Sequence, residues 1–115
     1  MIDCLFCKIA RKKKREDIVY EDSDFIAFRD AHPQAPVHLL IIPKEHLGIV
    51  ECDVERKHAV CRKIFGVARK IAETAGIGGA YKLLVNAGYS ASEGPDHLHV
   101  HLIGGWGSPT EVRHA

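Results

Sequence analysis

Three histidines in one short segment have a residue type and a spacing that could do chemistry. His97, His99 and His101 occupy every second position, and the residues between and after them are leucine or valine. Side chains alternate between the two faces of a β-strand, so the three imidazoles would share one face and the apolar side chains the other. Neighbouring imidazoles would then stand about 7 Å apart, given a rise of about 3.3 Å per residue. That spacing suits contacts with one phosphate-sized group better than three bonds to one metal ion.

Two kinds of chemistry fit such a histidine face, and the residues alone leave both open. An imidazole can attack phosphorus as a nucleophile while neighbouring imidazoles act as hydrogen-bond donors or acids. Alternatively, part of the set can bind a metal ion. Cys4 and Cys7, with two residues between them, also indicate metal binding or redox chemistry, because the N-terminus lacks the residue order expected of a secretion signal. Cys52 and Cys61 are interpreted as small packing residues.

The rest of the sequence predicts the elements that must position these histidines. The predicted strands are 18–21, 25–29, 37–42, 81–85 and 97–102, and a short helical turn is expected at 4–10. A long helix is expected between Asp53, which can act as its N-cap, and the glycines at 76–79. Its core face is predicted from apolar residues at helical spacing: Val60, Ile64, Val67, Ala68, Ile71 and Ala75. Several strands, one long helix and no repeated strand–helix unit indicate an α+β fold with an antiparallel sheet.

Length and composition limit the classes of protein that the sequence can encode. The 115 residues correspond to one domain, expected to span 1–115, and the hydrophobic share of 46% excludes a disordered chain. The longest apolar run, at 39–42, is far short of a transmembrane helix. Five of the 16 Lys and Arg residues lie at 11–15, so one basic segment is present but no chain-wide nucleic-acid surface. We expect an intracellular protein, cytoplasmic or also nuclear, with no membrane and no specific nucleic acid as partner.

The segment around the three histidines resembles a known family. The residues at 97–103, His-Leu-His-Val-His-Leu-Ile, match the histidine triad pattern. Further blocks follow the family in the same order: Asp30-Ala-His-Pro-Gln-Ala-Pro-Val-His38, Ile42-Pro-Lys-Glu-His46, Asn86-Ala-Gly88 and Gly104-Gly105. Over residues 3–106, the chain is similar to the nucleoside-phosphoramidase branch of the histidine triad nucleotide-binding proteins.

The resemblance implies a fold and a reaction. The fold is a five-stranded antiparallel sheet with one long helix and a short N-terminal helix. The reaction is hydrolysis of a purine nucleoside 5′-phosphoramidate, of the AMP or GMP type, through a nucleotidyl group bound covalently to a histidine. His99 would be the nucleophile, and His101 would hydrogen-bond the phosphate or the leaving group. His38 would support the site, and Asn86 would lie near the phosphate.

The resemblance also assigns residues to the nucleotide. Asp30 would hold the ribose, because a carboxylate can accept hydrogen bonds from both sugar hydroxyls. The base would lie in an apolar slot formed by Leu5, Phe6, Ile9, Phe28 and Leu40. Many relatives carry Gln and Ser where this chain has Glu93 and Gly94. The backbone N–H of Gly94 is one candidate to replace the missing hydroxyl near the phosphate.

A zinc ion and a second subunit also follow from the resemblance. Cys4, Cys7, His46 and His97 would form a closed tetrahedral site, which is structural because no coordination position is left open. The chemistry itself would need no cofactor. The long helix and the strand at 81–85 would meet their mates in a homodimer.

Two other functions stay open. A second branch of the family hydrolyses dinucleoside polyphosphates, and the same histidines would serve that reaction. Alternatively, the protein is a nucleotide- or protein-binding regulatory module whose hydrolysis is incidental, because intact catalytic residues do not prove a physiological reaction. The block at 33–36, the glycine pair after the triad and the short chain favour phosphoramidate hydrolysis.

Overall fold

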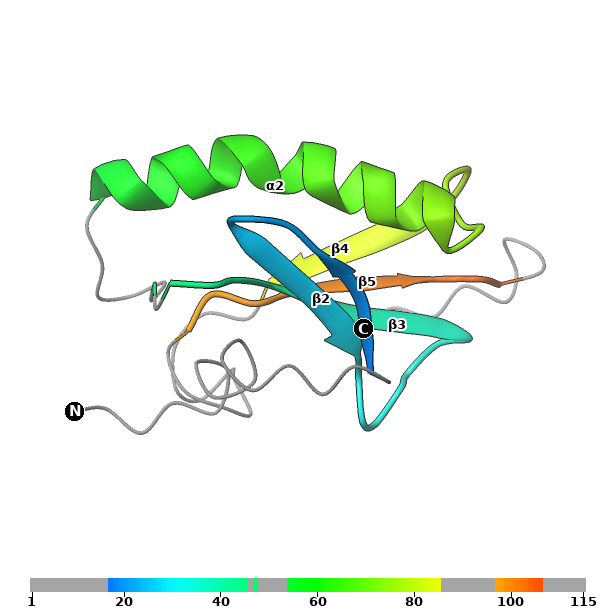
Figure 1. Cartoon of the computed structure of the whole chain (residues 1–115). Coiled ribbons are helices and arrows are strands. Elements are labelled where there is room, and N and C mark those ends of the chain that lie inside the picture. The colour runs from blue at the N-terminus through cyan, green and yellow to red at the C-terminus, as the bar shows by residue number, and fades with distance from the viewer. Residues whose placement is uncertain (1–16, 46, 48–53, 86–96, 107–115) are drawn as a thin grey trace.

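Five strands and one long helix make up the described part of the protein. The structure, a computed structural model, describes residues 17–45, 47, 54–85 and 97–106. The elements are β1 (Ile18–Glu21), β2 (Phe25–Arg29), β3 (Val37–Pro43), α2 (Val54–Thr74), β4 (Tyr81–Val85) and β5 (Val100–Gly104). The strands form one antiparallel sheet in the order β1-β2-β3-β5-β4, and α2 lies across one face of it (Figure 1). The predicted α+β fold is therefore confirmed, whereas the short helix expected at 4–10 lies outside the described residues.

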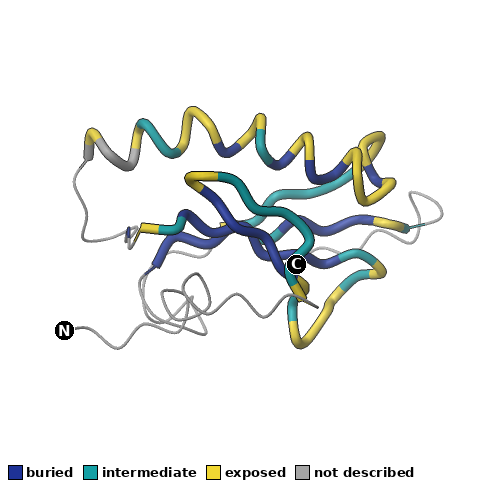
Figure 2. Tube along the Cα trace, in the orientation of Figure 1, coloured by how far each residue is buried: buried dark blue, intermediate teal, exposed yellow. Residues whose placement is uncertain are grey.

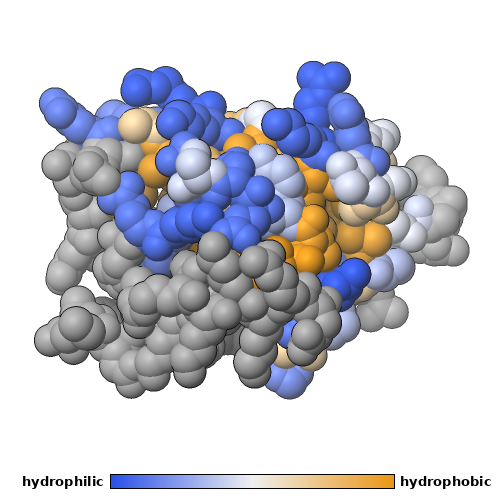
Figure 3. Space-filling view, viewed as in Figure 1, coloured by the Kyte–Doolittle hydropathy of each residue, from blue (hydrophilic) through white to orange (hydrophobic). Residues whose placement is uncertain are grey.

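α2 packs on the sheet through one apolar side. Ile64, Ala68 and Ile71 follow one another at helical spacing and are buried in one cluster with Leu39 and Leu102 of the sheet. Buried and exposed positions alternate along the helix in Figure 2, and Figure 3 shows polar residues over its outer side. Within the described residues, no helix is long and apolar enough to cross a membrane.

Two details of the predicted helix are wrong. Ala75, expected on the apolar face, is exposed because the helix ends one residue before it, and Ala72 is buried instead. Cys61, expected to pack in the core, is exposed and lies one helical turn before the exposed Phe65. The helix ends as predicted at a glycine, since Gly76 adopts a φ of 82°, which side chains disfavour.

The face of the sheet opposite α2 has a second apolar cluster. It consists of Ile26, Phe28, Leu40 and Ile42, with Ile18 packed against it. The alternate residues of β2 and β3 belong to the cluster beneath α2, so both strands are largely buried on both faces. This confirms the prediction of a buried strand at 37–42, although the strand also includes Pro43.

β5 starts at Val100, whereas the sequence predicted a strand from residue 97. Continuing the pairing of Ile41 with Val100 would bring Pro43 opposite Leu98, and proline has no N–H to donate. The Leu98 N–H is bonded instead to the carbonyl of Leu47 at 2.6 Å. The backbone at Leu98 is therefore bonded to the segment after β3 and does not continue the ladder with β3.

Gly104 and Gly105 end β5 at a crowded point. A Cβ on Gly104 would lie 2.9 Å from Cδ1 of Ile77 and 3.1 Å from the carbonyl oxygen of Ala80. Gly105 has a φ of 92°, a left-handed conformation that favours glycine, and a Cβ there would lie 3.1 Å from Cβ of Pro36. The glycine pair therefore lets the chain leave the sheet where any side chain would collide with its neighbours.

One carboxylate organises the turn between β1 and β2. Asp22 accepts hydrogen bonds from the N–H groups of Asp24 (2.8 Å) and Phe25 (2.7 Å), and from the Tyr20 hydroxyl (2.7 Å). Burial by itself would raise the pKa of Asp22. The Tyr20 bond, the two backbone bonds and the charge of Lys44 outweigh burial, so the pKa of Asp22 lies below its usual value. The ionised carboxylate therefore stabilises the hairpin.

We expect Asp22→Asn to lower the melting temperature at neutral pH, with a difference that shrinks as the pH falls below about 4. A carboxylate whose pKa is lowered by folding stabilises the native state above its unfolded pKa. That contribution is lost as the pH falls through the folded pKa. The measurement is thermal unfolding across this pH range, with Asp17→Asn, an exposed aspartate, as the control. A difference that is the same at every pH would contradict the role given to the charge.

Candidate active site

A row of paired residues crosses the sheet on the face opposite α2. Phe28 on β2 pairs with Leu40 on β3. Leu40 also pairs with His101 on β5, which in turn pairs with Leu84 on β4. Directly paired residues point to the same face of a sheet, with Cβ atoms about 4.5–5.5 Å apart. The sheet therefore brings two buried residues of the predicted base slot next to the predicted phosphate-binding histidine.

A second row, two residues along the strands, contains His38 and Asp30. His38 points to the same face as Leu40, because the two residues are two positions apart on β3. Asp30 follows the last residue of β2, and its N–H donates to the carbonyl of His38 at 3.0 Å. The side chains of His38 and Asp30 are 4% and 15% exposed. An acid from the connection between β2 and β3 and an imidazole from β3 thus lie beside His101.

One backbone N–H determines where two of the histidines carry their hydrogens. The Gln34 N–H donates to Nδ1 of His38 at 2.9 Å, so neutral His38 carries its hydrogen on Nε2. Nε2 of His38 lies 2.8 Å from Nδ1 of His101. Nδ1 of His101 accepts this bond, so neutral His101 carries its own hydrogen on Nε2. The chain of bonds from Gln34 through His38 therefore ends in an N–H donor on the ring of His101.

A second backbone group orients His99. Its Nδ1 lies 2.8 Å from the carbonyl oxygen of His97, and a carbonyl can only accept, so the lone pair of neutral His99 is on Nε2. The ring centroids of His99 and His101 are 5.4 Å apart, with 70° between the ring planes. Those of His38 and His101 are 5.1 Å apart. The three imidazoles therefore form one cluster, in which His99 has a lone pair and His101 an N–H on the equivalent nitrogen.

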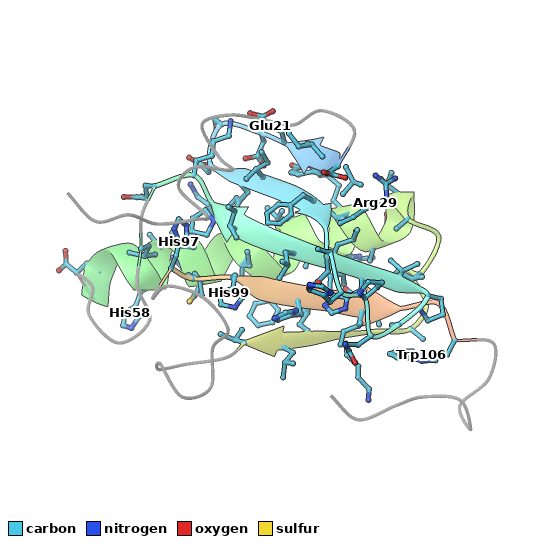
Figure 4. All side chains as sticks on the ribbon, turned by 90° about the horizontal axis from the view of Figure 1, so that it is seen from below. Glu21, Arg29, His58, His97, His99 and Trp106 are labelled. Carbon is cyan, nitrogen blue, oxygen red and sulfur yellow. The ribbon has the colours of Figure 1, made fainter. Side chains whose placement is uncertain are left out.

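His97 has a different environment from the other two histidines of the triad. It is 1% exposed, and its Nε2 donates to the carbonyl of Pro43 at 3.0 Å. Figure 4 shows His97 and His99 on the segment that leads into β5, with Trp106 beyond the other end of the strand. The expected strand through all three histidines is therefore wrong, and of the three only His101 lies on β5.

Asp30 contacts the histidine cluster, a contact that the sequence did not predict. Its Oδ1 accepts the N–H of His32 at 2.7 Å. Its Oδ2 lies 3.2 Å from Nε2 of His38 and 3.8 Å from Nδ1 of His101. Neither this contact nor the bond from Gln34 has a sequence signal, because both depend on how the loop at 30–36 turns back towards β3.

Asp30, His38 and His101 have the composition of a metal site, with one ligand atom from each lying within 4.8 Å of the others. A metal ligand must offer a lone pair, however, and the Gln34 N–H leaves neutral His38 with a hydrogen on Nε2. The 2.8 Å between the two imidazole nitrogens is a hydrogen-bond distance. The cluster therefore fits a shared hydrogen better than a shared cation.

The environment of His97 fits the zinc ligand that was predicted there. Its Nε2–H is bonded to the Pro43 carbonyl, so its lone pair is on Nδ1. Histidines that bind metals usually donate their other ring N–H to a carbonyl or a carboxylate. The remaining predicted site residues lie outside the described residues: Cys4, Leu5, Phe6, Cys7, Ile9, His46, Asn86 and Gly94.

The fold and the site define a class of protein: a small α+β domain whose histidines, on and just before an interior strand, stand beside an apolar cluster. A family model described as "Scavenger mRNA decapping enzyme C-term binding" matches residues 3–111 of the chain. The histidine-rich segment at 97–103 lies inside that match.

Relatives with solved structures carry the same fold. A HIT family hydrolase from Legionella pneumophila Philadelphia 1 aligns with a TM-score of 0.79 at 39% identity, over 90% of this chain and 94% of that chain. A histidine triad protein from Clostridium difficile aligns with a TM-score of 0.81 at 32% identity, over 95% of this chain and 96% of that chain. The 14 kDa zinc-binding protein of Zea mays is 39% identical over 103 residues, which cover 88% of this chain and 80% of that protein. The chain belongs to the histidine triad family.

Proposed function

We propose that the protein hydrolyses nucleotides at the α-phosphorus, with purine nucleoside 5′-phosphoramidates as substrates. The observation that carries the proposal is a pair of contacts: Nδ1 of His99 lies 2.8 Å from the His97 carbonyl, and Nδ1 of His101 lies 2.8 Å from Nε2 of His38. We infer from them that the lone pair of His99 and the hydrogen of His101 are both on Nε2. Displacement at a phosphate needs such a nucleophile and such a donor, held in place before the reaction. The name of the Legionella relative, a hydrolase, supports hydrolysis as the reaction class.

The reaction would proceed in two displacements at the same phosphorus. Nε2 of His99 would form a bond to the α-phosphorus while the bond from phosphorus to the amine nitrogen breaks, and the leaving nitrogen would take a proton from a solvent water, so that the neutral amine departs. Water would then attack the phosphorus of the nucleotidyl-histidine, releasing the nucleoside monophosphate and restoring His99. The carbonyl of His97, which accepts from Nδ1, would stabilise the positive charge that the substituted ring acquires.

His101 would stabilise the phosphate by a hydrogen bond. Its Nδ1 accepts the hydrogen of His38, so the hydrogen that it would donate to a phosphate oxygen is the one on Nε2. Because His38 and His101 are both neutral in this arrangement, neither imidazole has an extra proton to give to the leaving group. The role that fits His101 is therefore a donor of fixed orientation, and His38 is the residue that keeps its tautomer.

The two rows of the sheet support a purine nucleotide as the substrate. Phe28 and Leu40 lie in the same row as His101. A base packed against these two side chains would therefore bring the 5′-phosphate of its nucleotide to the histidine cluster. Apolar contacts bind the face of any purine and distinguish poorly between adenine and guanine. The carboxylate of Asp30, in the adjacent row, would accept hydrogen bonds from the sugar.

We also propose a structural zinc ion held by Cys4, Cys7, His46 and His97. The tautomer of His97 supports it, because the Pro43 carbonyl holds the Nε2–H and leaves the lone pair on Nδ1. The printed name of the maize relative is a second support. When bound, the ion would stabilise the fold by linking distant segments.

A homodimer joined through β4 and α2 is the assembly that we propose. β4 lies at the edge of the described sheet. Phe65 on α2 is 67% exposed and Val85 at the end of β4 is 48% exposed, so each element carries an apolar side chain in water. A second copy would cover the edge strand and bury these side chains.

His99→Ala should lower the turnover of adenosine 5′-phosphoramidate by at least about 10³-fold and leave AMP binding intact, because it removes the attacking lone pair but not the binding contacts. Turnover and AMP affinity are measured beside His58→Ala, an exposed histidine of α2 that should behave as the wild type. A nucleotidyl group trapped on the wild type should map to His99. Mapping to His101, or faster turnover of a dinucleoside polyphosphate, would contradict the proposal.

Freshly purified protein that has not met a chelator should contain one zinc ion per chain. Cys4→Ser should lower the metal content and the melting temperature but leave some activity, since a closed site stabilises the fold without touching the substrate. Metal analysis and thermal unfolding are the measurements, and Cys61→Ser, an exposed cysteine, is the matched control. Wild-type protein without zinc would refute the site.

Light scattering should give about twice the 12.8 kDa mass of one chain. Phe65→Asp should shift the protein towards the monomer, because a charge in an apolar interface is costly to bury. Ser23→Asp, in the exposed turn between β1 and β2, is the control for an added charge. A wild-type mass of one chain would exclude the dimer.

A further inference from the structure

Nε2 of His38 has one hydrogen and faces two acceptors. Nδ1 of His101 is 2.8 Å away and Oδ2 of Asp30 is 3.2 Å away. The two acceptors are 3.8 Å from each other, and both contact the same ring nitrogen of His38. The Gln34 N–H holds the other nitrogen of that ring at 2.9 Å, and turning the ring over would break this bond. The hydrogen of His38 is therefore bonded to His101, and the carboxylate of Asp30 lies close enough to compete for it.

Competition from Asp30 for the His38 hydrogen works against the tautomer of His101 that donates from Nε2 to phosphate. A hydrogen bond shared between two acceptors is weaker towards each of them, and an ionised carboxylate is the stronger acceptor of the two. The charge of Asp30 also lies close to the lone pair on Nδ1 of His101, which favours moving the hydrogen of His101 to that nitrogen. When no ligand donates to its Oδ2, Asp30 thus loosens the orientation of the phosphate donor.

We propose that Asp30 is a positioning residue that couples occupancy of the sugar site to the tautomer of His101, an inference that rests on the proposed function. When a ligand hydroxyl donates to Oδ2, the carboxylate becomes a weaker acceptor and the hydrogen of His38 goes to His101. His101 is then held with its own hydrogen on Nε2, the form that donates to phosphate. Sugar hydroxyls therefore raise the rate of the chemical step as well as the affinity.

The surroundings of Asp30 leave one oxygen for this exchange. Oδ1 is held by the His32 N–H at 2.7 Å, and the backbone N–H of Asp30 is bonded to His38 at 3.0 Å. These two bonds fix the carboxylate against the histidine, so Oδ2 is the atom that meets both Nε2 of His38 and an incoming donor. The side chain is 15% exposed, so a ligand can reach it with little competition from water.

The test compares a substrate with sugar hydroxyls and one without, on the wild type and on Asp30→Ala. The substrates are adenosine 5′-phosphoramidate and its 2′,3′-dideoxy analogue. On the wild type, kcat should be lower for the dideoxy substrate, because no sugar hydroxyl binds Asp30 and the carboxylate still competes with His101 for the His38 hydrogen. On Asp30→Ala, kcat for the dideoxy substrate should rise about two- to tenfold above the wild-type value, the effect of strengthening one hydrogen bond.

A plain contact between Asp30 and the ribose predicts a different pattern. It would raise KM for the adenosine substrate on Asp30→Ala and leave kcat for the dideoxy substrate unchanged or lower, and that result would overturn the coupling. Asp30→Asn keeps an acceptor for the His32 N–H while removing the charge, so it should show the same rise if Asp30→Ala folds poorly. Asp17→Ala, an exposed aspartate before β1, should change neither kcat.

Nitrogen NMR of the histidine rings separates failure of the coupling from failure of the proposed reaction. In the ligand-free protein, Asp30→Ala should move the nitrogen resonance of His101 Nδ1 towards the chemical shift of a more strongly hydrogen-bonded acceptor. The same substitution should raise the fraction of His101 rings that carry their hydrogen on Nε2. A wild type that hydrolyses neither substrate would contradict the proposed function alone. Identical His101 spectra in the wild type and Asp30→Ala would overturn the coupling, whatever the activity.

Discussion

The pairing of β3 with β5 is the interaction on which the candidate site depends. Its register sets Leu40 opposite His101 and His38 opposite Ile103, and so joins residues 63 positions apart in the sequence. A shift of one residue would turn the histidine of either strand into the cluster beneath α2. Apolar side chains hold this register from both sides, because β3 is buried under α2 on one face and in the second cluster on the other.

Backbone groups decide which nitrogen of each histidine carries the hydrogen. The Gln34 N–H, the His97 carbonyl and the Pro43 carbonyl each engage one ring nitrogen, of His38, His99 and His97 respectively. Three chemically identical side chains thereby differ: His38 has a hydrogen directed at His101, His99 has its lone pair on Nε2, and His97 has its lone pair on Nδ1. These differences follow from the path of the chain and do not depend on the side chain of Gln34.

In the coupling that we propose, the position of Asp30 would link sugar binding with the chemical step. Had the carboxylate stood farther from His38, it would bind a sugar without influence on the imidazoles. At 3.2 Å from Nε2 of His38 it competes for the same hydrogen that orients His101. A hydrogen bond in a shielded site is strong enough for such competition to matter, because little water replaces a lost partner.

The amino-acid sequence by itself determined the elements and the family. The apolar run of β3, the helical spacing of α2 and the turn residues around Asp22 are local signals, and each produced its element within a few residues. The order of motifs identified the triad, and of the residues assigned from it, Asp30, His38, His99 and His101 meet in one cluster.

Only the tertiary structure decided how these residues are used. The sequence predicted three imidazoles on one face of one strand, but Pro43 has no N–H for the sheet ladder and its carbonyl accepts from His97, so β5 begins at Val100. It also gave no sign of Gln34, whose backbone N–H sets two tautomers. These features depend on which backbone groups form hydrogen bonds with side chains in the folded protein. The pattern of side chains along the sequence carries no information about those hydrogen bonds.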